Sequence, residues 1–83
     1  MNENRAIVIF QIPDRGFSCD LDIPLTITAQ ELMEALDEAY QLGMKSRQPR
    51  DQYLRSENPI ALLRGPVLLE ESGLHHGSIL IVP

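Results

Sequence analysis

Residues 26–43 constrain the fold of this chain most, because they are the only stretch that carries strong helical signals. Thr28 is a favourable N-cap residue, whose hydroxyl can accept a hydrogen bond from the Glu31 N–H. The Glu31 side chain can reach back to the Thr28 N–H, which completes a capping box. Ile27 precedes the cap and is placed to pack on Leu32 as a hydrophobic staple.

The predicted helix has one apolar stripe and closes at Gly43, which can adopt the left-handed conformation common at helix ends. Such a helix cannot bury its own stripe, so the rest of the chain must form the surface against which it packs. The expected apolar face consists of Leu32, Leu36, Ala39 and Tyr40, with Ala29 and Met33 at its edge.

The segment before the helix predicts a β-hairpin. Residues 5–12 are β-branched and apolar, which favours a strand. Residues 13–16 read Pro-Asp-Arg-Gly, a combination typical of turns. Residues 17–23 then alternate strictly between apolar and polar side chains, as a half-buried strand does.

A four-residue turn fixes the register of this hairpin. Directly opposed residues share a face of the sheet, so the apolar positions of the two strands meet on the side of the helix. Ile7 and Ile9 then point to the opposite side. The expected pairs on the helix side are Ile12 with Phe17, Phe10 with Cys19, and Val8 with Leu21.

The remainder of the chain predicts three more short strands. Residues 44–52 are polar and are expected to form an ordered loop, followed by strands at 53–56 and 60–63. Residues 70–74 are expected to form a single helical turn or tight loop, and residues 78–82 the last strand. The order is β-β-α-β-β-turn-β, which is typical of a single α+β domain spanning residues 1–83.

Composition excludes several classes of function. The chain has 83 residues and a net charge of −5, which argues against a general nucleic-acid or membrane-surface binder, because their affinity depends on Lys and Arg. No segment has transmembrane length or the pattern of a signal peptide, so direct membrane insertion is not expected. The single cysteine permits no internal disulfide and fits a reducing compartment.

The spacing of a set of residues across nearly the whole chain carries a family resemblance. The set comprises the hairpin, the helix start Ile27-Thr28-x-x-Glu31-Leu32, and Tyr53-Leu54-Arg55, Asn58, Gly65, Leu69, Gly73-Leu74 and Gly77. The chain resembles the ubiquitin-like β-grasp proteins, and among them the YukD/EsaB family of bacterial ubiquitin-like proteins. The resemblance implies a mixed sheet of about five strands that wraps one central helix.

The resemblance also implies a function. Proteins of this family are non-catalytic accessory components of type VII (WXG-type) secretion systems in Gram-positive bacteria, and they bind other components on the cytoplasmic side of the membrane. Related domains are fused to membrane components. The chain is therefore expected to be cytoplasmic, or to be attached to the membrane through a partner or through a C-terminal membrane region missing from this sequence.

The expected protein-interaction surface is the sheet face turned away from the helix. In the β-grasp fold the first and last strands are parallel neighbours, with the Tyr53 strand on the other side of the last. A contiguous apolar patch on this face would mark an interface, either with the secretion machinery or with a second copy. The alternatives are that residues 44–52 cover the patch or that a one-residue slip in register exchanges the faces. The predicted contact residues are Ile7, Ile9, Tyr53, Arg55, Ile79 and Ile81.

The sequence predicts no catalytic, cofactor-binding or metal site. Cys19 is either a nucleophile or a small buried hydrophobe, and its place on the apolar side of a strand favours the second. His75 and His76 are adjacent, and they lack the spacing or the additional partners of a metal-ligand set. There is no glycine-rich phosphate-binding loop. An enzyme is therefore not expected.

Two other functional classes remain open at this stage. A ubiquitin-like modifier or sulfur carrier requires a flexible Gly-Gly tail whose carboxylate is adenylated, whereas this chain ends Leu80-Ile81-Val82-Pro83, so that function requires a longer natural chain. An adaptor domain of an unrelated larger protein is the third possibility. Mass spectrometry of carboxyl-terminal adducts tests the modifier. Neighbouring genes for small WXG-type substrates and an FtsK-like ATPase would favour secretion over a general adaptor.

Overall fold

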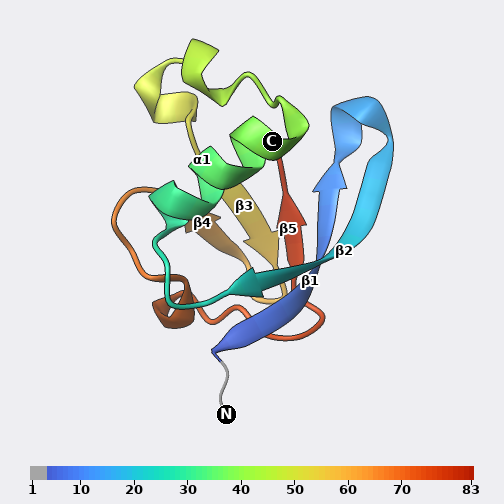
Figure 1. Ribbon diagram of the computed structural model, residues 1–83, viewed down its shortest axis with the longest axis vertical. Coiled ribbons are helices and arrows are strands. Elements are labelled where there is room, and N and C mark those ends of the chain that lie inside the picture. The colour runs from blue at the N-terminus through green and yellow to red at the C-terminus, as the bar shows by residue number, and fades with distance from the viewer. Residues whose placement is uncertain (1–3) are drawn as a thin grey trace.

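One mixed sheet packed against one α-helix, α1 (Ala29–Tyr40), forms the framework of residues 4–83, the part of the chain that the computed structural model describes (Figure 1). The five strands follow the order β2-β1-β5-β3-β4 across the sheet. The predicted α+β architecture is therefore confirmed. The strands are β1 (Arg5–Ile12), β2 (Phe17–Pro24), β3 (Leu54–Glu57), β4 (Ala61–Leu63) and β5 (Ile79–Ile81).

The hairpin forms in the predicted register, with Phe10 opposite Cys19 and Ile12 opposite Phe17. β5 runs parallel to β1 and antiparallel to β3, so it lies at the centre of the sheet. The segment between α1 and β3 contains two 3-10 turns, Met44–Ser46 and Pro49–Asp51, which agrees with the expected ordered loop.

The N-terminal end of α1 is fixed by side-chain and main-chain acceptors. The capping box is confirmed: the Glu31 N–H donates to Thr28 Oγ1 over 3.0 Å, and the Thr28 N–H donates to Glu31 Oε1 over 2.8 Å. The next N–H groups of the helix bond to the loop before the last 3-10 turn, Leu69–Glu71. The Ala29 N–H, for example, donates to the Val67 carbonyl over 2.8 Å. Backbone donors at a helix start need such external partners.

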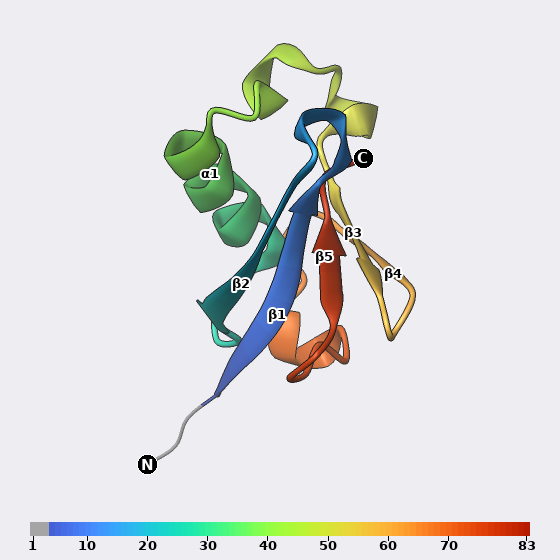
Figure 2. The same ribbon diagram turned by 90° about the vertical axis from the view of Figure 1, so that its right-hand side faces the viewer.

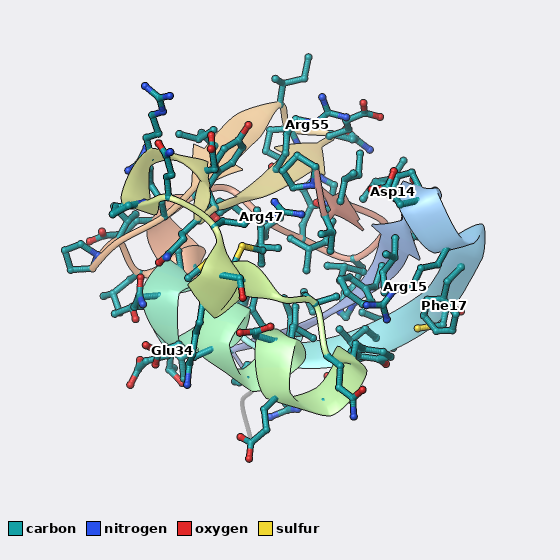
Figure 3. The ribbon with its side chains drawn as sticks, turned by 90° about the horizontal axis from the view of Figure 1, so that it is seen from above. Asp14, Arg15, Phe17, Glu34, Arg47 and Arg55 are labelled. Carbon is teal, nitrogen blue, oxygen red and sulfur yellow. The ribbon has the colours of Figure 1, made fainter. Side chains whose placement is uncertain are left out.

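The C-terminal end of α1 differs from the prediction. The helix ends at Tyr40, and Gln41 takes the left-handed conformation with φ of 54°, whereas Gly43 opens the following 3-10 turn. The cause is Arg15 in the hairpin turn, whose guanidinium donates to the Tyr40 carbonyl over 2.6 Å and to the Gln41 carbonyl over 2.5 Å. Figure 3 shows Arg15 beside the end of α1. The last turn of α1 contains no basic residue, so Arg15 provides the positive charge that a helix C-terminus favours.

The buried stripe of α1 is centred differently from the prediction. Met33 is fully part of it, whereas Ala39 is exposed. At 100° per residue Ala39 lies about 60° from Leu36 and further from Ala29, which places it at the margin of the stripe. The buried helical residues are Ala29, Leu32, Met33 and Leu36.

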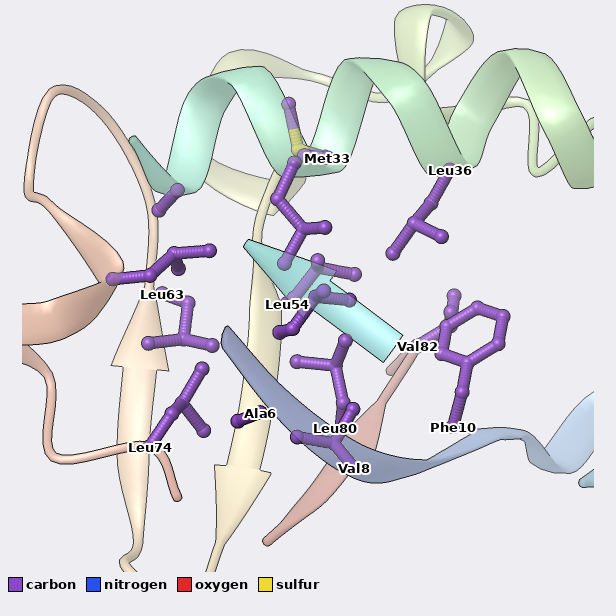
Figure 4. Close-up of a cluster of buried hydrophobic side chains, with 14 of the residues drawn as sticks. Ala6, Val8, Phe10, Met33, Leu36, Leu54, Leu63, Leu74, Leu80 and Val82 are labelled. Atoms are coloured by element: carbon purple, nitrogen blue, oxygen red, sulfur yellow. The ribbon is translucent and has the colours of Figure 1, made fainter. Parts of the chain in front are cut away.

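The core lies between α1 and the inner face of the sheet (Figure 4). Phe10 joins this core to the end of the helix, because its ring centroid lies 5.1 Å from that of Tyr40. Phe17 extends the same aromatic cluster, with its centroid 5.5 Å from Tyr40. Leu80 and Val82 are buried on the helix side, as the sequence predicted.

Replacing Thr28 by alanine tests the helix start. Thr28→Ala removes the acceptor of the Glu31 N–H, which should lower the free energy of unfolding by about 1 kcal/mol. In a domain of this size we expect the melting temperature to fall by roughly 4–8 °C. Thermal unfolding followed by circular dichroism measures this change. Thr26→Ala is the matched control, since Thr26 is exposed and its side chain makes no hydrogen bond within residues 4–83; equal effects would contradict the capping role.

Candidate protein-interaction surface

The outer face of the sheet, turned away from α1, brings together the strands that carry the predicted contact residues. Ile9 in β1 lies opposite Ile79 in β5. Arg55 in β3 lies opposite Ile81 in β5. Figure 2 shows α1 on one side of the strands and β1, β5, β3 and β4 in succession across the sheet. The parallel pairing of β1 and β5 thus places isoleucines from the two ends of the chain side by side.

Exposure varies strongly along this row. Ile7 is 49% exposed, and Ile9 and Ile79 are half-buried. Ile81 is only 5% exposed, so the prediction that it is an open contact residue is wrong. Ile81 lies in the central strand, where residues on both neighbouring strands stand directly opposite it. Both of those residues, Gln11 and Arg55, have long side chains that flank Ile81.

The structure adds one exposed apolar residue to this face that the sequence prediction omitted. Leu62 in β4 lies opposite Arg55 and is 55% exposed, so it continues the apolar row to the sheet edge. The pairing of Leu63 with the buried Leu54 already determines this orientation, because adjacent strand residues face opposite sides. We call the exposed and half-buried members of the row the outer patch: Ile7, Ile9, Arg55, Leu62 and Ile79.

Tyr53 is half-buried at the end of the outer face. It lies with Arg47, Asp51 and Pro83 around a shallow hollow of about 350 Å³. Arg47 and Asp51 belong to the 44–52 segment, so this segment approaches the outer face at its Tyr53 end. The exposed fractions of Ile7 and Leu62 show that it leaves the remainder open.

Charged side chains border the outer patch. Arg5 Nε donates to Asp22 Oδ1 over 3.0 Å, an exposed ion pair whose contribution to stability is about 0–1 kcal/mol. Asp20 lies opposite Ile9, and Glu57 lies opposite Ile79. Within residues 4–83 neither of these two carboxylates takes part in a salt bridge. Carboxylates thus lie beside the apolar row at two places, Asp20 beyond β1 and Glu57 within β3.

Cys19, one of the residues considered for chemistry, contacts Tyr40 of α1. Cys19 is half-buried, which is more open than predicted, because β2 is an edge strand and no further strand of residues 4–83 lies beside it. Its Sγ lies 3.8 Å from the Tyr40 hydroxyl. The hydrogen bond with Cys19, followed by burial of the phenol and the charge interaction with the thiol, raises the pKa of Tyr40 above its ordinary value.

The adjacent histidines stabilise the turn that leads into β5. His76 Nδ1 accepts a hydrogen bond from the Ile7 N–H over 3.0 Å, so it must be the unprotonated nitrogen of the ring. His75 Nδ1 lies 2.8 Å from the His76 carbonyl oxygen, which accepts its hydrogen bond. Among residues 4–83 no group of three or more His, Cys, Asp or Glu side chains is arranged to hold a metal ion.

Comparison with known proteins supports the fold. A solved structure of a protein designed de novo on the basis of ubiquitin is similar to this chain, with a TM-score of 0.66 and 20% sequence identity over 99% of this chain and 90% of the designed one. No family model matches the chain. No curated protein matches it either. The chain thus has the ubiquitin-like β-grasp fold.

The structure also bears on membrane association. Among residues 4–83 it contains no helix with the length and apolar character needed to span a membrane.

Thiol labelling tests the packing of Cys19. Because Cys19 is half-buried beside Tyr40, we expect Ellman's reagent to modify it more slowly in the native protein than in the same protein unfolded by guanidinium. The two rates are followed by absorbance under otherwise identical conditions. Equal rates would show that the thiol is fully accessible, and they would reopen its interpretation as a nucleophile.

Proposed function

We propose that this chain is a non-catalytic protein-binding module whose partner docks on the outer patch. The observation that carries this proposal is a row of mostly apolar side chains across four strands of the outer sheet face, in which Ile7 is 49% and Leu62 55% exposed and Arg55 lies beside Leu62. Large apolar side chains that are open and contiguous usually mark an interface.

The outer patch is well organised for binding. Its central members, Ile9 and Ile79, lie on neighbouring strands that are hydrogen-bonded to further strands on both sides, so their backbone is rigid. A rigid surface loses little conformational entropy on association, which favours affinity. Arg55 lies within the apolar row, and arginine is one of the residue types that often dominate binding energy.

We further propose that the module serves type VII secretion in a Gram-positive bacterium, as an accessory component on the cytoplasmic side of the membrane. Support comes from the resemblance of this chain to YukD/EsaB-like proteins. The resemblance includes the helix start Ile27-Thr28-x-x-Glu31-Leu32, which in this chain forms the capping box described above. The partner would be a component of the secretion machinery. The bordering carboxylates, Asp20 and Glu57, favour a partner surface with basic residues around an apolar centre.

A double substitution on the outer patch tests this proposal. Ile7→Glu with Leu62→Glu introduces two charges at exposed positions, so the fold should persist while the apolar contact is lost. In the source organism, with the native gene deleted, we expect secretion of small WXG-type substrates to be restored by the wild-type chain and to fall at least about tenfold with the variant, as expected for an interface hot spot.

Val67→Glu is the matched control, because Val67 is 48% exposed but lies in the loop before the last 3-10 turn rather than on the sheet. The control should restore secretion. Normal secretion with a folded double variant would contradict binding through the outer patch. Secretion that is unaffected by deletion of the gene would contradict the role in secretion.

A further inference from the structure

A second surface of this molecule has an unused hydrogen-bonding edge. Among residues 4–83, β2 is an outermost strand of the sheet and pairs only with β1. Its eight residues, Phe17–Pro24, pair continuously with β1 without a bulge. Proline, bulges or a covering loop normally protect so long an edge. In β2 the only proline is the last residue, Pro24.

The hydrogen-bond pattern identifies the groups on this edge. The Leu25 N–H donates to the Asn4 carbonyl over 2.7 Å, and bonded and non-bonded pairs alternate along an antiparallel ladder. The non-bonded pairs therefore include Ile9 with Asp20, and the Ile9 N–H indeed turns to the other side, where it donates to the Ser78 carbonyl over 2.9 Å. The residues of β2 whose main-chain groups point away from the sheet are thus Ser18, Asp20 and Asp22.

These main-chain groups are open. All three residues are exposed. Within residues 4–83, the one contact to their outward main-chain groups comes from Arg5 Nη2, which donates to the Asp22 carbonyl over 3.5 Å. Three N–H donors at alternate positions thus remain available to an added strand, which is the arrangement used in β-strand addition.

The two sides of the edge differ in chemistry. On the helix side, Phe17 is 37% exposed and Cys19 and Leu21 are half-buried, because no further strand covers them. On the outer side, Asp20 and Asp22 are exposed carboxylates. Residues of an added strand would lie directly opposite these side chains, with alternate residues on alternate faces. The edge therefore fits a strand with apolar residues on one side and basic residues on the other.

We propose that the free edge of β2 binds an extended partner segment of alternating apolar and basic residues, which adds to the sheet as a sixth strand. Its apolar side chains contact Phe17, Cys19 and Leu21, and its basic side chains lie opposite Asp20 and Asp22. This site differs from the outer patch in using main-chain groups at the sheet edge, and the Asp20 carboxylate borders both. The net charge of −5 of the whole chain also favours a basic segment.

Charge disfavours a second copy of this chain as the occupant. Among the antiparallel registers in which the open main-chain groups of two β2 strands face each other, the two with the most overlap place Asp20 opposite Asp20 or Asp20 opposite Asp22. Like charges directly opposed across a ladder are destabilising. A lysine or arginine at those positions of the partner removes this repulsion.

The test uses an acetylated and amidated seven-residue peptide of alternating valine and lysine, with valine at both ends. Hydrogen exchange followed by NMR should show the Ser18, Asp20 and Asp22 amides slowed at least about tenfold at saturation, as expected for newly bonded N–H groups. In antiparallel addition, the residues opposite Asp20 and Asp22 are those whose N–H groups face β2. A matched peptide, N-methylated at its lysines, lacks these donors and should bind at least about tenfold more weakly. A peptide with glutamate in place of lysine should not bind.

A substitution in β2 tests the same hydrogen bonds from the side of the protein. In Asp20→Pro the lost N–H points away from β1, so the hairpin ladder is retained while one edge donor is removed. Binding of the valine–lysine peptide should fall at least about tenfold. It should be unchanged in Leu62→Glu, which alters the outer patch in β4, at the opposite edge of the sheet from β2. If Asp20→Pro fails to fold, the N-methylated peptide still decides the question.

The opposite results would overturn the proposal. These are equal binding of the parent and N-methylated peptides, no binding of the parent peptide, or slowed exchange at the outer patch instead of at β2. A dimer in analytical ultracentrifugation without peptide, with protected Ser18 and Asp20 amides, would instead identify a second copy as the occupant.

Discussion

Hydrogen bonds at both ends of α1 determine where the helix lies on the sheet. A helix of 12 residues is marginal by itself in water, so its position depends on contacts made by other parts of the chain. At its start, carbonyl groups of the 65–67 loop accept the Ala29 and Gln30 N–H groups. At its end, Arg15 binds two carbonyl groups. The loop and the hairpin turn thus hold the helix across the inner face, and the core beneath it follows from that placement.

Features that depend on neighbouring residues were predictable from the sequence. The capping box needs only Thr28 and Glu31 three positions apart, and the hairpin register needs only the length of the turn. Features that depend on distant residues were not. The helix ends before Gly43, where Arg15 binds the Tyr40 carbonyl. Arg15 lies 25 residues away from Tyr40 in sequence, so this contact could not be predicted from the residues around the helix end. Ile81 is buried because residues of the neighbouring strands β1 and β3 flank it. The alternation of apolar residues within β5 does not reveal this.

The candidate site illustrates the same division. The pairing of Ile9 with Ile79 required the parallel arrangement of β1 and β5, which was expected only from the resemblance to β-grasp proteins. Leu62 was within reach of the sequence argument, because it adjoins the core residue Leu63. Fold similarity to a ubiquitin-based design identifies the architecture, whereas function depends on surface residues that the fold leaves free to vary. The two regions proposed to bind partners differ in what they offer, side chains in the outer patch and main-chain groups at the β2 edge.

The contact from Arg15 links two parts of the molecule that would otherwise unfold separately. Hairpin tips and helix ends are usually the first segments to open in a native protein. Here the tip of the hairpin holds the end of α1, and the aromatic rings of Phe17 and Tyr40 pack directly beside that contact. Opening either segment breaks the bonds of the other, so the two behave as one cooperative unit. An insertion at residues 13–16, which a surface turn would ordinarily tolerate, therefore acts on the helix as well as on the hairpin.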